Sequence, residues 1–91
     1  MKNYNISIHC MRKRIRLETE AASVPTALRL AFEEICEELR STAVDLDPSE
    51  TTHEGARKCR TFSFRGLMRT HEGRYVECEG EATIAAIAGH L

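Results

Sequence analysis

The stretch TFSFRGLMRTHEGRYVECEGEATI, residues 61–84, decides the fold class because it predicts a β-hairpin in one defined register. Apolar residues alternate with polar ones on both sides of a three-residue loop, His71–Gly73, that ends in a glycine. Such a loop combines a type I turn with a bulge, and glycine supplies the positive φ of its last position. Hydrophobic phase, turn chemistry and cross-strand charge all agree on this register. The resulting pairs are Phe64 with Gly80, Arg65 with Glu79, and Arg69 with Tyr75.

An amphipathic helix precedes the hairpin in the sequence. Ser23 is a suitable N-cap, and Pro25 fits the first turn because its missing N–H has no helical partner there. Ser41-Thr42 marks the expected end of the helix. One face repeats apolar residues at the 3.6-residue period and is predicted to meet the core. Its members are Val24, Leu28, Ala31, Phe32, Ile35, Cys36 and Leu39.

The first twenty residues read as strand, but in two halves that are out of phase. Ile6 and Ile8 occupy even positions, whereas Ile15 and Leu17 occupy odd ones. Either a β-bulge near residues 10–13 absorbs one residue, or a tight turn at residues 12–14 separates two strands. We favour one long bulged strand because the turn lacks Gly, Asn and Asp.

Residues 45–56 show no periodicity and contain Pro48, Gly55 and several turn formers, so they predict an acidic, mobile loop. The expected order is therefore strand–helix–strand–strand. The fold class is α+β, with one amphipathic helix packed on a three- to four-stranded, mainly antiparallel sheet. With 91 residues, the chain is expected to form a single domain, residues 1–91.

Composition excludes several classes of protein. A chain with 42% hydrophobic and 30% charged residues is expected to be globular, and no apolar run approaches the length of a membrane span. The first five residues lack the apolar stretch of a signal peptide, so we expect a cytoplasmic location and reduced thiols. The four cysteines contain no Cys-x-x-Cys pair and predict neither zinc nor a disulfide framework. They are Cys10, Cys36, Cys59 and Cys78.

No catalytic, metal or cofactor motif is recognised. The histidines lie far apart in the sequence, and the glycines form no phosphate-binding loop. Glu77, Glu79 and Glu81 share one strand face at the spacing of a carboxylate cluster. Because Arg65 is expected opposite them, we interpret them as an ion-pair ladder rather than a catalytic group. We therefore expect a protein that is not an enzyme.

Two charged surfaces are candidates for partner binding, although the net charge is only −1. The first is the helix face away from the core, where like charges four residues apart oppose helix stability and surround an apolar anchor. Its residues are Leu30, Glu33, Glu34, Glu37 and Glu38. The second is a basic set that can contact nucleic acid or an acidic partner if its strands are neighbours. Its residues are Arg12, Lys13, Arg14, Arg16, Arg57, Lys58 and Arg60.

Two resemblances extend these expectations. The order strand–helix–strand–strand, with Arg65-Gly66 and Glu72-Gly73-Arg74-Tyr75-Val76, resembles the dodecin topology. Dodecins stack flavin on tryptophan, and this chain has no tryptophan. Residues 15–23, which run into Ala27–Ala31, resemble small phage proteins that include certain anti-CRISPR proteins. That resemblance implies a protein that inhibits a nuclease complex by binding it.

Three hypotheses for function follow. The leading one is a non-enzymatic protein-binding module, an inhibitor of a host complex encoded by a phage or mobile element. The second is a small nucleic-acid-binding domain that uses its basic strands. The third is a small homo-oligomer that binds a ligand between its subunits.

Overall fold

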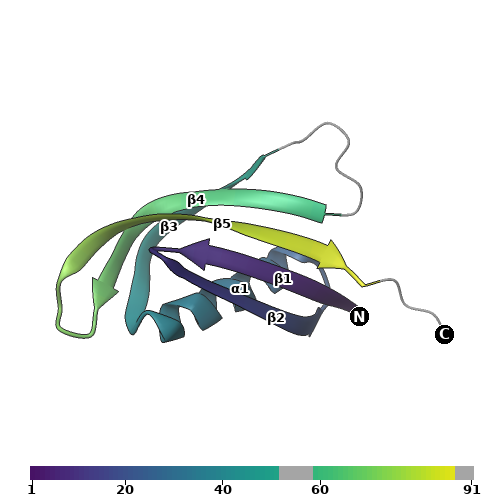
Figure 1. Cartoon of the computed structure of the whole chain (residues 1–91), viewed down its shortest axis with the longest axis horizontal. Coiled ribbons are helices and arrows are strands. Elements are labelled where there is room, and N and C mark those ends of the chain that lie inside the picture. Colours follow the sequence, from purple (N-terminus) through teal and green to yellow (C-terminus); the bar gives the residue numbers. More distant parts are fainter. Residues whose placement is uncertain (52–58, 88–91) are drawn as a thin grey trace.

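The computed structural model describes residues 1–51 and 59–87 as one helix and a five-stranded antiparallel sheet (Figure 1). The strand order is β2-β1-β5-β4-β3. The α+β class and the single packed helix are confirmed, but the described residues contain five strands instead of three or four. The elements are β1 (Lys2–Cys10), β2 (Lys13–Ala21), α1 (Val24–Glu38), β3 (Ser41–Thr51), β4 (Cys59–Thr70) and β5 (Tyr75–Ala86).

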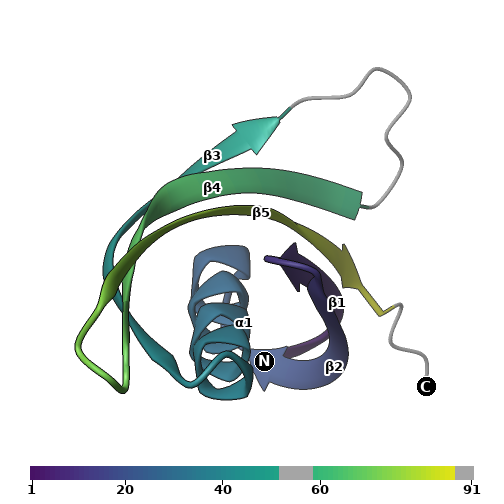
Figure 2. The same cartoon turned by 60° about the vertical axis from the view of Figure 1, so that its left-hand side comes forward.

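The sheet curves around α1, so that one face is concave and covered by the helix (Figure 2). The helix contacts both edge strands, β2 and β3, as well as the inner strands β1 and β5. Its N-cap is Ser23, as predicted, and the Ser23 hydroxyl accepts a hydrogen bond from the Thr26 N–H at 3.4 Å. Alternate residues of the inner strands and one face of the helix form the core. The largest fully buried side chains of this core are Ile6, Ile8, Cys10, Ile35, Met68 and Ile84.

Residues 2–21 form a hairpin, so the predicted single bulged strand is wrong. Met11 and Arg12 form a two-residue turn with φ of 51° and 71°. A two-residue turn places even positions opposite odd ones, so Ile8 pairs with Ile15. The turn itself therefore absorbs the change of phase in the sequence, and no bulge is needed.

The β4–β5 hairpin has the predicted register and loop. The Gly73 N–H donates to the Thr70 carbonyl at 2.8 Å, and the Thr70 N–H donates to the Arg74 carbonyl at 2.8 Å. Gly73 has a φ of 85°, as the loop type requires. Phe64 pairs with Gly80, where a Cβ atom would come within 2.6 Å of the Phe64 ring. The ring thus occupies the space that a side chain at position 80 would need.

Residues 45–51, predicted as part of a loop, belong to the edge strand β3, and residues 52–56 lie outside the described residues. The register with β4 shifts between Ala43 and Asp45, so Val44 is an extra residue in a bulge. Pro48 is compatible with this strand because one side of an edge strand has no partner for its N–H groups. The bulge and the proline interrupt the alternation of polar and apolar residues, so the sequence pattern does not indicate a strand here.

Candidate protein-binding groove

An apolar groove of about 550 Å³ lies between α1 and the edge strand β3. Its apolar lining comes from both elements: Phe32 and Cys36 from the helix, with Ala43, Val44 and Leu46 from the strand. Charged and polar residues at its rim are Arg29, Glu33, Glu37 and His71. Sequence analysis missed this groove because it placed Leu46 in a loop and assigned no strand to residues 41–44.

The bulge in β3 explains why an edge strand rich in acidic residues presents an apolar wall here. Ala43 pairs with the buried Met68, and Leu46 pairs with Gly66. Without the extra residue Val44, the alternation of side chains would place Ala43 and Leu46 on opposite faces. The bulge brings both to the helix side and leaves Val44 half exposed, at 51% of its surface. An exposed valine beside partly buried apolar residues is the accessible part of the groove.

The floor of the groove is packed against the hydrophobic core. The Phe32 ring packs edge-to-face on Phe64 with ring centroids 4.9 Å apart, which connects the floor to the core. Burial raises the pKa of the Cys36 thiol, and the nearby Ala43 backbone opposes part of this rise. Cys36 is therefore a neutral side chain that adds to the apolar surface.

The acidic helix face is divided by the structure. Glu33 and Glu37 line the groove, whereas Glu34 and Glu38 do not. All four side chains are exposed, and the Glu38 carboxylate lies 3.6 Å from the Lys13 ammonium. Leu30, predicted to be an exposed anchor, is instead partly buried against the core, so that expectation is wrong. Val44 of β3 is instead an exposed apolar residue in the groove that Glu33 and Glu37 line.

The predicted basic set does not form one surface. Arg12, Lys13, Arg14 and Arg16 are exposed in the β1–β2 turn and β2, at one edge of the sheet. Arg60 lies on β4, from which β2 is separated by two strands. Arg57 and Lys58 are outside the described residues. The sheet order thus separates positions that the sequence analysis grouped together.

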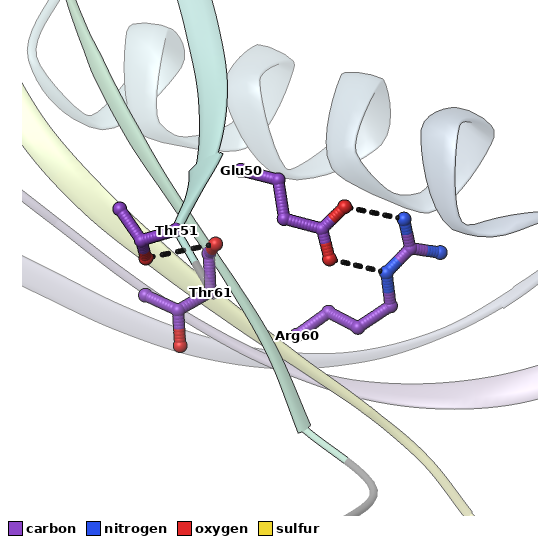
Figure 3. A network of polar contacts seen from close by, with 4 residues as sticks. All are labelled: Glu50, Thr51, Arg60 and Thr61. Atoms are coloured by element: carbon purple, nitrogen blue, oxygen red, sulfur yellow. Dashed lines mark hydrogen bonds and ion pairs between the residues drawn. The ribbon is translucent and has the colours of Figure 1, made fainter. Parts of the chain in front are cut away.

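Arg60 has a partner of its own. Its guanidinium donates two hydrogen bonds of 2.7 Å to the Glu50 carboxylate, beside the bond from the Thr51 hydroxyl to the Thr61 carbonyl (Figure 3). The hydrogen bonds to Arg60 lower the pKa of the exposed Glu50 carboxyl. The paired Arg60 is therefore less available to a phosphate group than Arg14 and Arg16 of β2, for which no ion pair is found among the described residues.

A second depression, of about 710 Å³, lies on the outer face of the sheet and is lined by polar and charged residues. Arg65 and Glu79 lie across from each other there, with 3.5 Å between their charged groups, so one pair of the predicted ladder is confirmed. Glu77 and Glu81 face Leu67 and Ser63 of β4 instead of cations. His9 pairs with Glu81 at its border. The lining carries one cation, Arg65, against the carboxylates of Asp47, Glu79 and Glu81. We prefer the apolar groove as the contact site because interfaces are commonly built around an apolar centre.

The thiols and other metal-ligating side chains make no metal site in the part of the chain that is described. Cys10 and Cys78 are buried, and burial raises the pKa of Cys10 to about 12 and also raises that of Cys78. These thiols stay protonated at neutral pH and act as small core residues. All four cysteines are free, as expected.

Comparisons with protein-family models, with curated proteins and with solved structures give no match to this chain. Within residues 1–51 and 59–87, no helix has both the length and the apolar character needed to span a bilayer.

Proposed function

We propose that the protein is a non-enzymatic protein-binding module and that the groove between α1 and β3 is its contact surface. The observation that carries this proposal is an accessible apolar strip, centred on Val44, beside two carboxylates on an otherwise charged surface. Interfaces commonly combine a small apolar centre with a polar rim. The groove has both parts.

The charge on α1 supports a basic partner. Glu33 with Glu37 and Glu34 with Glu38 are like-charged pairs four residues apart, and each costs about 0.2–0.5 kcal/mol in an isolated helix. They lie toward the C-terminal, negative end of the helix dipole, which adds to the cost. A partner that brings Lys or Arg to this surface would offset that cost. Of these four carboxylates, only that of Glu38 has a cation within ion-pair distance among the described residues.

An inhibitory role is the form of binding that we favour. The resemblance of residues 15–31 to anti-CRISPR proteins supports it, because those proteins act by occupying a surface of a nuclease complex. A small domain with an apolar groove can work in this way without chemistry of its own. The expected target is a host defence or nuclease complex that presents basic residues.

Val44→Glu tests the proposal. In the complex, the partner would bury the glutamate charge, which opposes binding. In the free protein, Val44 is half exposed, so the substitution should leave the melting temperature unchanged. Leu67→Glu is the matched control, because Leu67 is an apolar residue of β4, exposed at 37%, outside the groove. Both variants and the wild-type protein would be used to capture partners from the source organism, and the partner would then be purified and titrated.

We expect the purified partner to bind the wild-type protein and Leu67→Glu equally. Binding to Val44→Glu should be at least about tenfold weaker, the usual effect at a central contact. Equal binding to all three proteins would assign the contact to another surface and contradict the proposed function.

A further inference from the structure

We propose that the groove receives a basic amphipathic helix of the partner, which inserts its side chains, and not a strand added to the free edge of β3. This inference rests on the proposed function, since it specifies the partner that the groove accepts. Apolar grooves beside a sheet edge can bind peptides in either way, so the backbone of β3 decides between them.

The register shows which backbone groups of β3 face outward. Thr70 hydrogen-bonds across the loop toward β5, so alternate residues of β4, including Gly66, direct their N–H and C=O groups to β5. Their partners in β3 then face away from β4. These outward-facing residues are Leu46, Pro48 and Glu50.

This edge is poorly suited to a new strand. Pro48 has no N–H, so only Leu46 and Glu50 offer donors in this stretch, four residues apart. On the other side of Leu46, the extra residue Val44 interrupts the regular spacing of the backbone groups. An added strand would lose a bond at Pro48 and meet an irregular ladder at the bulge, and prolines and bulges are the usual protection of sheet edges.

The helix side of the groove has the spacing of a helix-binding surface. Phe32 and Cys36 are four residues apart, about 6 Å along the axis, and form one ridge of the lining. Arg29, Glu33 and Glu37, also four residues apart, form a parallel ridge beside it, in which two negative charges follow one positive charge toward the C-terminal end of the helix. A helix packed along α1 would meet both ridges at once. It should carry apolar residues three or four apart and, on one flank, Lys or Arg at the same spacing.

A second copy of α1 does not satisfy this requirement. Its own exposed flank carries Glu33, Glu34, Glu37 and Glu38, which would face the same acids across the contact. Like charges at an interface disfavour association. The charge pattern therefore selects a different, basic chain.

Selection from a displayed library of random sixteen-residue peptides tests the inference on the full-length protein. Val44→Glu serves as the counter-target that removes peptides bound elsewhere. We expect enriched sequences with apolar residues at helical spacing and a basic flank. Enrichment of alternating, strand-like sequences or of acidic ones would overturn the proposal, and so would the absence of any enrichment that depends on Val44.

Charge reversal on the two flanks of α1 provides a matched comparison with the best peptide. Glu33→Lys with Glu37→Lys changes the groove flank, while Glu34→Lys with Glu38→Lys makes the same change of net charge on the other flank. We expect at least about tenfold weaker binding for the first pair and a smaller loss for the second. Equal losses would show that only net charge attracts the peptide and would overturn the proposal.

Leu46→Pro and Leu46→Ala separate the two binding modes. Both remove the Leu46 side chain, but only proline also removes an outward-facing N–H that none of the five described strands uses. A helix held by side chains should bind both variants alike. Much weaker binding to Leu46→Pro would identify strand addition and overturn the inference, while leaving the proposed function intact. The proposed function would be contradicted by a different result, namely that the native partner binds Val44→Glu as tightly as it binds the wild-type protein.

Discussion

Among single residues, Gly73 makes the clearest prediction of a stability effect. It has a φ of 85°, and an added Cβ atom would find nothing within 4 Å. Gly73→Val should therefore lower the free energy of unfolding by about 1–3 kcal/mol through backbone strain alone. Gly73→Asn should cost less, because asparagine tolerates this region. Urea titration of both variants measures the difference, and equal stability of Gly73→Val and wild type would contradict the turn geometry.

The buried thiols predict how stability depends on pH. The folded state holds the Cys10 proton up to a pKa of about 12, whereas the unfolded thiol releases it near 9.0. Above pH 9 the unfolded state therefore loses protons first, so stability falls as pH rises through this window. Below it, Cys10 contributes no pH dependence.

Thermal melts between pH 7 and 11 check this prediction. Lys and Tyr also titrate at high pH, so the comparison is with Cys10→Ala, which starts from a lower melting temperature but should lose less of it on going to high pH. An equally steep fall in both proteins would show that Cys10 does not drive the effect.

Exposure at single positions was the least predictable property of the site. Leu30 was assigned to solvent from its angle on the helical wheel, but the curved sheet contacts α1 from both edges, so the core extends beyond one narrow stripe. Val44 gave no signal in the sequence, since a residue in a bulge follows no period. Both errors arise because the exposure of these residues depends on the tertiary structure, which the periodicity of the sequence does not predict.

At the scale of elements, the β1–β2 turn stands out because it uses two residues that are poorly suited to it. Met11 and Arg12 both have positive φ, where Asn-Gly is the favoured pair. Met11→Asn with Arg12→Gly should therefore stabilise the domain by about 1 kcal/mol or more. Chemical denaturation of the double variant checks this. A decrease in stability would mean that the Met11 or Arg12 side chain makes contacts worth more than the strain.

The same turn explains why sequence analysis chose the wrong alternative for residues 2–21. The phase change was read correctly, but the missing Gly, Asn and Asp argued against a hairpin. The β4–β5 hairpin was predicted in full because Gly73, the apolar phase and the charges all agree. β3 was missed because its alternation is broken by Val44 and then by Pro48. Edge strands are easily missed in sequence analysis, because the N–H and C=O groups on their outer side need no partner and irregular residues are tolerated there.

At the scale of the whole molecule, the separation of basic residues predicts weak binding to nucleic acid. The cations of β2 stand apart from Arg60, which Glu50 already pairs. We expect no sub-micromolar binding of a mixed-sequence oligonucleotide at physiological salt, since that needs several convergent phosphate contacts. Fluorescence anisotropy across a salt series measures it. Tight binding that falls steeply with salt and is lost in Arg14→Glu with Arg16→Glu would favour the nucleic-acid hypothesis instead.

The sheet order also has a consequence for the growing chain on the ribosome. β1 leaves the exit tunnel well before β5, yet it lies between β2 and β5, so one side of it stays unpaired until β5 is made. The β1–β2–α1 unit can form early through local contacts, but it must wait with an open inner edge. Chaperone binding to that exposed edge should therefore be strongest just before β5 emerges, and completion of β5 should end it.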